Sequence, residues 1–278
     1  MENGRLIKID LEKVIGDKNP KLLKLLPGFI IRYLKRIIHQ DEINDFLKTN
    51  HNLYGLDFTK AVLDRFGVKI KIIGSEHIPE NGRILFAANH PLGGLDGVAL
   101  IWTIGQKLPN VLFPVNDILM NLPNLRELFI PINKHGSNLQ NAKIIENTFA
   151  GDHTMLYFPA GLCSRKLHGE IIDMEWKKTF VNKARKHKRD ILPVHISGKN
   201  SNFFYNLANI RKKLGIKINI EMLYLVDEMF KQKDKDLVIT FGQPIPYSTL
   251  DKSKTDRAWA KIIKRKVYQL GETQQTEK

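Results

Sequence analysis

The sequence predicts an α/β domain whose mixed, largely parallel sheet is flanked by helices, with an N-terminal helical cap and a C-terminal helix. Short apolar runs of strand length alternate with helical patterns from residue 66 to residue 246. Two of these runs end in polar loops that contain glycine, as strands do beside the ligand sites of α/β sheets. We therefore expect an N-terminal helical segment (1–65), an α/β domain (66–246) and a basic C-terminal helix (247–278).

Composition limits the partners and the compartment. The 278 residues carry a formal net charge of +15, which favours an anionic partner such as nucleic acid, an anionic membrane surface or an acidic carrier. The one cysteine, Cys163, excludes an internal disulfide and indicates a reducing compartment. Residues 1–5 lack the layout of a signal peptide, and no apolar run approaches the ~18 residues of a membrane span. We expect a cytoplasmic protein, or a peripheral one on the cytoplasmic side of the cell membrane.

Residues 22–38 are the most distinctive part of the N-terminal segment. Apolar side chains recur there at helical spacing, with lysine and arginine between them. Pro27 and Gly28 should break the pattern, so that Pro27 begins a second helix. A basic amphipathic helix can lie in an anionic membrane interface, or its apolar stripe can pack on the protein's own core. Both interpretations stay open.

The remaining elements follow from periodicity and from turn residues. We expect strands at residues 68–74, 85–88, 111–115, 128–132, 154–158, 191–196 and 237–241. We expect helices at residues 41–50, 57–66, 118–125, 138–149, 176–187, 202–213, 220–230 and 255–270, and one that begins near residue 98.

The first stretch that carries chemistry is residues 85–97, where a strand, a loop and a helix start follow one another. His90 ends the strand, and Asp96 stands near the start of the helix. A neutral imidazole held by a carboxylate is a general base that can take a proton from a hydroxyl group. Gly93 and Gly94 let the loop turn sharply and approach a substrate. The alternative is a surface loop in which the histidine caps a turn and the aspartate opens the helix.

The second stretch is residues 157–166, where another strand ends in a loop with proline and glycine. Arg165 suits bidentate recognition of a phosphate or a carboxylate, and Lys166 adds a point charge. The alternative is a charged turn that faces only solvent.

Four blocks in order carry a resemblance. They are Asn89-His90 with Asp96, Phe129-Ile130-Pro131-Ile132, Phe158-Pro159-Ala160-Gly161 with Arg165, and Leu192-Pro193-Val194-His195. Their order over residues 66–245 resembles the lysophospholipid (glycerolipid) acyltransferase family, of which bacterial lysophosphatidate acyltransferase is typical. The third block has Ala160 where phospholipid enzymes have glutamate, and Ser164-Arg165 follows it. This resembles the branch that O-acylates lyso-aminolipids such as lyso-ornithine or lyso-glycine lipids. The separation of His90 and Asp96 is one residue longer than the family's usual one.

The resemblance implies an acyl thioester donor, on acyl carrier protein or coenzyme A, and a lyso-lipid acceptor at an anionic membrane surface. His90 would be the base, Asp96 its orienting partner and Arg165 the anchor for the acceptor's anionic group. No cofactor and no metal are needed for such a transfer. The expected site comprises catalytic His90 and Asp96 and the substrate-binding residues Asn89, Gly93, Gly94, Phe158, Pro159, Gly161, Ser164, Arg165 and Lys166.

Other functions stay open at this stage. Cys163 could serve as a nucleophile with His90 or His168, although most lone cysteines are inert packing residues. His195 lies in an apolar strand, which favours a satisfied core histidine over a ligand. The positive charge permits a non-catalytic lipid-binding or nucleic-acid-binding protein. We expect no nucleic-acid partner, because no known motif and no basic platform with aromatic residues is present.

Overall fold

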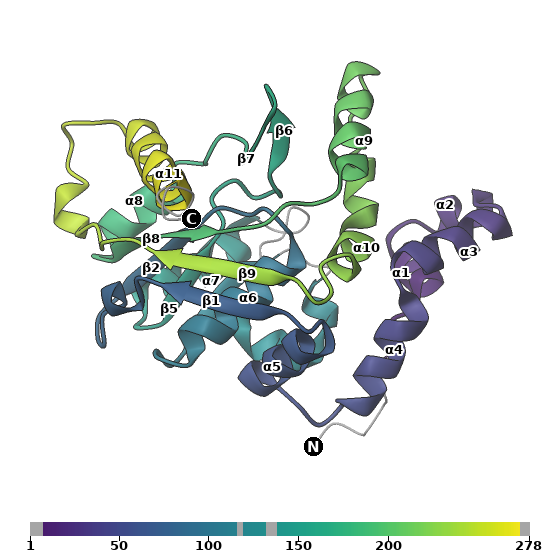
Figure 1. Ribbon diagram of the computed structural model, residues 1–278. Coiled ribbons are helices and arrows are strands. Elements are labelled where there is room, and N and C mark those ends of the chain that lie inside the picture. The colour runs from purple at the N-terminus through teal and green to yellow at the C-terminus, as the bar shows by residue number, and fades with distance from the viewer. Residues whose placement is uncertain (1–7, 116–118, 132–137, 273–278) are drawn as a thin grey trace. The chain divides into compact units, whose positions relative to one another are not determined.

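The structure is a computed structural model that describes residues 8–115, 119–131 and 138–272 (Figure 1). Residue contacts divide the chain into two compact units. The smaller unit combines Met1–Leu53 with Asn200–Lys233, and the larger one combines Tyr54–Lys199 with Asp234–Lys278. This division differs from the predicted boundaries, because a segment from late in the chain joins the N-terminal helices.

The larger unit is built on a mixed, largely parallel sheet, which confirms the predicted fold class. The strands are β1 (Lys69–Ile73), β2 (Ile84–Ala88), β3 (Val111–Val115), β4 (Phe129–Pro131), β5 (Thr154–Tyr157), β8 (Asp190–Ile196) and β9 (Asp236–Phe241). Within the described residues they lie in the order β1-β9-β8-β2-β5-β3-β4. Neighbouring strands are parallel except β8 and β9, which are antiparallel.

Strand β2 lies in the middle of this sheet and leads into the first chemical stretch. All of its residues are buried, and since successive side chains point to opposite faces, both faces of the sheet are covered. The helices of this unit are α5 (Gly55–Arg65), α6 (Gly94–Gly105), α7 (Asn138–Ala150), α8 (Thr179–Lys186) and α11 (Asp256–Glu272). Leu85 and Ala87 form one core cluster with side chains of α7, α8 and α11, among them Phe149, Phe180 and Ile263. The core thus fixes the strand end that precedes His90.

The smaller unit is helical. It contains α1 (Leu11–Lys18), α2 (Pro20–Leu25), α3 (Gly28–Ile37), α4 (Gln40–Thr49), α9 (Asn202–Lys213), the 3-10 helix η4 (Ile220–Tyr224) and α10 (Leu225–Phe230). Contacts of His39 join its two chain segments: the ring stacks on Phe230 at 3.8 Å between centroids, and Nε2 lies 3.1 Å from Asp227 Oδ1. The hydroxyl groups of Tyr33 and Tyr224 are 2.8 Å apart. These contacts explain why residues 200–233 belong with the N-terminal helices.

The predicted break in residues 22–38 is present. Pro27 is the cap of α3, and Gly28 rather than Pro27 is its first residue. Leu25 is 78% exposed and Phe29 is 62% exposed, whereas Ile37 is buried. The apolar stripe of α2 and α3 is therefore largely uncovered. No helix in the described part of the chain has the length and apolar character needed to cross a membrane.

Some local predictions were wrong. The predicted helix at 176–187 begins only at Thr179, and the two short antiparallel strands before it, β6 (Arg165–Leu167) and β7 (Glu170–Ile172), were not predicted. They are too short to show a period of two, and His168 and Gly169 turn between them with positive φ. The predicted helix at 118–125 is replaced by the 3-10 helices η2 (Leu119–Asn121) and η3 (Pro123–Leu128). Residue 118 is the first of the predicted helix at 118–125, and residue 132 is the last of the predicted strand at 128–132. Both lie outside the described residues.

Candidate active site

Asn89 links the ends of two central strands. It directly follows β2, its side-chain nitrogen donates to the carbonyl of Ile196 in β8 at 2.9 Å, and its oxygen accepts from the Ile196 N–H at 2.7 Å. The side-chain amide is buried, and its nitrogen and its oxygen both take part in hydrogen bonds within the protein. We expected Asn89 to bind substrate, but it fixes the strand end from which His90 projects.

His90 and Asp96 form the expected pair. Nδ1 of His90 lies 3.0 Å from Oδ2 of Asp96, and the same oxygen accepts the backbone N–H groups of Leu92 at 2.8 Å and Gly93 at 3.0 Å. Asp96 lies in the first turn of α6, and Gly93 has a φ of +87°, a conformation that favours glycine. The loop therefore takes up its extra residue as a wider turn, and the carboxylate still reaches the imidazole.

The charges of this pair are set by burial and by close partners. Burial raises the pKa of Asp96, while the contact with His90 lowers it. Burial lowers the pKa of His90, but the neighbouring Cys163 sulfur and the Asp96 carboxylate together raise it well above 6.5. Oδ1 of Asp96 is buried and has no hydrogen-bond partner within the described residues. The pair is thus arranged to stabilise an imidazolium, which a general base forms when it takes a proton.

The second chemical stretch packs directly on the first. The ring of Phe158 stacks on the His90 imidazole at 4.1 Å between centroids, and Phe113 meets Phe158 edge to face at 5.2 Å. The N–H of Ser164 donates to the His90 carbonyl at 2.8 Å. These contacts fix both the plane of the imidazole and the distance between the two loops.

Asp173 connects these two loops by hydrogen bonds, and the sequence did not indicate it as a site residue. Its Oδ1 accepts the backbone N–H of His90 at 3.2 Å and the Ser164 hydroxyl at 2.6 Å, and its Oδ2 accepts the Trp176 indole N–H at 2.8 Å. Asp173 is buried. The one signal in the sequence is an acidic residue directly after an apolar pair, Ile171-Ile172, which is too weak to indicate a site.

Helix α11 supports Asp173 through its backbone. The Asp173 N–H donates to the Tyr268 hydroxyl at 2.6 Å, and Nζ of Lys264 donates to the Asp173 carbonyl at 2.6 Å. Burial lowers the pKa of Lys264 and raises the pKa of Tyr268. The C-terminal helix is thus part of the frame that holds His90.

Arg165 is directed inward. It is buried, and its Nη1 donates to the carbonyls of Cys163 at 2.7 Å and Ser164 at 3.3 Å. Arg165 and Lys166 both lie in β6, and the Lys166 side chain is only partly buried. The alternative of a charged turn that faces only solvent is therefore wrong for Arg165.

Pro159 and Gly161 shape the loop between Phe158 and Cys163. The Pro159 carbonyl accepts the N–H of Lys177 at 3.0 Å, and Gly161 has a φ of +67°. A methyl group on Gly161 would lie 3.2 Å from Nζ of Lys177. The Lys177 side chain therefore ends directly beside this loop.

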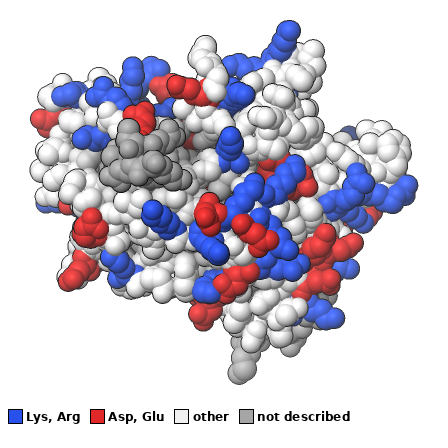
Figure 2. Space-filling view, viewed as in Figure 1, with Lys and Arg blue, Asp and Glu red and all other residues white. Residues whose placement is uncertain are grey.

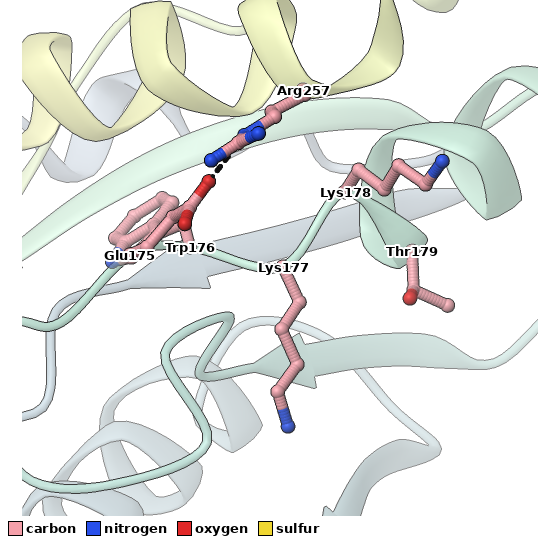
Figure 3. Close-up of a pocket in the computed structure, with 6 residues that line it drawn as sticks. All are labelled: Glu175, Trp176, Lys177, Lys178, Thr179 and Arg257. Atoms are coloured by element: carbon pink, nitrogen blue, oxygen red, sulfur yellow. Dashed lines mark hydrogen bonds and ion pairs between the residues drawn. The ribbon is translucent and has the colours of Figure 1, made fainter.

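A hollow of about 310 Å³ lies in the same unit (Figure 3). It is lined by Glu175, Trp176, Lys177, Lys178, Thr179 and Arg257. Glu175 and Arg257 form an ion pair at 2.5 Å, and the Lys177 side chain extends away from that pair (Figure 3). None of His90, Asp96 and Arg165 lines this hollow. Of these two places, the His90–Asp96 contact is the one with the geometry of a general base.

His195 lies in β8. Burial lowers its pKa to about 4, so the ring is neutral at physiological pH. Its Nδ1 is buried without a hydrogen-bond partner in the part of the chain that the structure describes, which differs from the satisfied core histidine that we expected.

The fold and this site define an α/β enzyme with a histidine–carboxylate pair at the end of a central parallel strand. A family model described as "Acyltransferase" matches residues 13–276. The chain therefore belongs to this acyltransferase family, and it is an acyl-transferring enzyme.

Two relatives match nearly the whole chain. The lyso-glycine lipid O-acyltransferase of Phocaeicola vulgatus is 51% identical over 272 residues, which are 97% of this chain and 98% of that protein. The lyso-glycine lipid O-acyltransferase of Bacteroides thetaiotaomicron is 49% identical and covers 97% of this chain and 100% of that protein. Among solved structures, the 1-acyl-sn-glycerophosphate (LPA) acyltransferase PlsC of Thermotoga maritima matches with a TM-score of 0.51 at 17% identity. That match covers 94% of this chain and 93% of the other, and it shows a shared fold.

Proposed function

We propose that this enzyme moves a fatty acyl group from a thioester, on acyl carrier protein or coenzyme A, to the hydroxyl of a lyso-aminolipid. The acceptor class follows the names of the two relatives, which favour a lyso-glycine lipid over lysophosphatidate. Ala160 agrees with this choice, because it stands where phospholipid acyltransferases have glutamate. The observation that carries the proposal is the 3.0 Å contact between His90 and Asp96 in a chain of this family.

His90 acts as the base in this mechanism. It takes the proton of the acceptor hydroxyl while that oxygen attacks the thioester carbonyl carbon. Asp96 holds Nδ1 and stabilises the imidazolium that forms. When the carbon–sulfur bond breaks, the imidazolium returns its proton to the departing sulfur. The products are an ester and a free thiol, and the histidine is neutral again.

The negative oxygen of the tetrahedral intermediate needs hydrogen-bond donors. The N–H groups of Gly93 and Gly94, in the loop that we expected to approach a substrate, are candidates for this role. The Gly93 N–H instead donates to Asp96, so only Gly94 remains a candidate from this pair.

Arg165 binds the anionic group of the acceptor in this proposal. It is the first residue of β6 and directly follows Ser164, whose N–H donates to the His90 carbonyl. The carbonyls of Cys163 and Ser164 accept from its Nη1 and so hold the guanidinium in place.

The enzyme works as a peripheral protein on the cytoplasmic side of the membrane in this proposal. The support is the exposed apolar stripe of α2 and α3, next to basic side chains and without an acidic residue between positions 20 and 38. Figure 2 shows Lys and Arg side chains gathered over these helices. Membership of an enzyme family favours this function over a non-catalytic lipid-binding or nucleic-acid-binding protein.

Acyl transfer by the purified protein tests the proposal. The protein is mixed with an acyl thioester of either carrier and with lyso-glycine lipid or lysophosphatidate, and the ester product is measured by mass spectrometry. We expect product with lyso-glycine lipid and little with lysophosphatidate. Product with lysophosphatidate alone would overturn the acceptor, and no product with either would overturn the proposal.

A further inference from the structure

Residues 210–218 form a second apolar and basic segment, which no part of the proposed reaction uses. The segment runs from the last turn of α9 into the loop before η4. Its apolar side chains are turned to solvent: Ile218 is 75% exposed, Leu214 68% and Ile210 56%. Single exposed apolar residues are ordinary, but a run of them in one segment marks an interaction site.

The charges of this segment all have one sign. Between the apolar residues stand Arg211, Lys212, Lys213 and Lys217, and no acidic residue interrupts them. The three lysines are exposed, and no ion pair involves them within the described residues. In Figure 2, basic side chains lie at the end of α9. A surface that binds here must therefore be both anionic and able to take up apolar side chains.

The segment is held in place from inside its own unit. Nε of Arg211 lies 2.8 Å from Oε2 of Glu221, which is fully buried, and Nη1 donates to the Ile216 carbonyl at 2.7 Å. On the opposite side of α9, Phe204 and Tyr205 are buried. The exposed apolar side chains therefore belong to a fixed helix and turn, and their exposure does not come from fraying.

This segment belongs to the same unit as α2 and α3. The Tyr224 ring meets Phe203 of α9 edge to face at 4.9 Å between centroids, and its hydroxyl lies 2.8 Å from that of Tyr33 in α3. One tyrosine thus contacts both α3 and α9. The smaller unit presents two elements of the same chemistry, although they are far apart in the sequence.

We propose that residues 210–218 are a second membrane-contact element, which binds an anionic lipid surface together with α2 and α3. The inference rests on the membrane attachment in the proposed function and adds a second site to it. Apolar side chains gain free energy when they enter the acyl region, and each lysine near an anionic surface strengthens binding. Two such elements in one unit give stable attachment where a single one is weak and reversible.

Vesicle sedimentation with the full chain tests this inference. The vesicles consist of phosphatidylcholine with about one-third phosphatidylglycerol, which gives the negative surface potential that lysines sense. We expect Leu214→Glu/Ile218→Glu to weaken partitioning by roughly tenfold or more. We expect Lys212→Gln/Lys213→Gln to weaken it by roughly tenfold at low salt and by less at high salt. The matched control is Ile144→Glu on α7 of the larger unit, which changes a similarly exposed isoleucine (43%) and should leave partitioning unchanged.

The alternatives give different results. If Leu214→Glu/Ile218→Glu lowers the melting temperature and leaves partitioning unchanged, another part of the chain covers this face and the inference fails. If it turns a dimer into a monomer in gel filtration with partitioning unchanged, a second copy covers the face and the inference fails as well. The variant Leu25→Glu/Phe29→Glu separates attachment by α2 and α3 from attachment by residues 210–218. If only this variant loses vesicle binding, residues 210–218 do not contact the membrane and attachment by α2 and α3 stands. If the parent protein does not sediment with the vesicles, membrane attachment itself is wrong. If the parent sediments and no variant alters binding, both elements are wrong.

Discussion

Asp173→Asn removes one charge from a buried group that holds His90 in place. An asparagine can keep its oxygen toward the His90 N–H and the Ser164 hydroxyl, but its amide nitrogen then faces the Trp176 indole N–H. Two donors would meet where a donor now meets an acceptor. Loss of the charged acceptor and an unpaired buried indole together cost about 2–4 kcal/mol of the free energy of unfolding.

The catalytic effect is separate from this loss of stability. Because the His90 N–H loses a charged partner, the imidazole shifts relative to the acceptor hydroxyl. A misplacement of about 1 Å can lower a rate by roughly 100-fold, so we expect a fall of roughly 10–100-fold. We expect this fall in kcat, per folded molecule, with the KM for the thioester unchanged. The assay is steady-state transfer at a temperature where circular dichroism shows the variant to be fully folded.

Trp176→Phe is the matched control for Asp173→Asn. It removes the indole donor together with part of a buried ring, so we expect a loss of stability but an almost normal kcat. The double variant should lose less stability than the sum of the two single variants, because two donors no longer face each other, and its kcat should stay low. If Asp173→Asn melts earlier but has a normal kcat when folded, Asp173 supports the fold and does not position His90.

Further predictions concern Arg165, Cys163 and the pH dependence of the reaction. Arg165→Ala should raise the acceptor's KM more than the donor's, and Arg165→Lys should not restore it, because lysine lacks the planar fork; unchanged acceptor kinetics would remove Arg165 from the binding site. Cys163→Ala should keep transfer within a few-fold of the parent, and an inactive, folded variant would instead favour a thiol nucleophile. The pH profile of kcat/KM should fall on the acidic side of a pKa above 6.5, since His90 must be neutral to accept a proton. Asp96→Asn removes a group that raises this pKa, so its profile should move to lower pH, and an unmoved profile would show that another group titrates.

The fold could be predicted because its signals are local. The run 84–88 is continuously apolar, as a strand buried on both faces must be, and the pair His90 and Asp96 is close in the sequence. The likeness of four blocks to a known family then supplied the reaction class, which the family match confirms.

The remaining features depend on contacts between distant residues. Asp173 lies 83 positions from His90, and its partner Tyr268 lies a further 95 positions away, so no local pattern connects them. Asn89 looked like a substrate ligand because an amide beside a catalytic histidine has that chemistry, but Ile196 takes both of its groups. Residues 200–233 looked like ordinary helices of the α/β domain, and only their contacts join them to the N-terminal unit.

The transfer rates of His90→Ala and Asp96→Asn, measured beside the parent with the same thioester and lyso-lipid, test the central claim most directly. We expect a folded His90→Ala protein whose rate falls by roughly 10²–10⁴-fold, the usual contribution of a positioned general base. Asp96→Asn should fall on a similar scale, because asparagine cannot stabilise the imidazolium. If Asp96→Asn works almost as well as the parent while His90→Ala is inactive, Asp96 only opens α6 and another group orients His90. If both variants keep the parent rate, the loop from Asn89 to Asp96 is structural and the proposed mechanism is wrong.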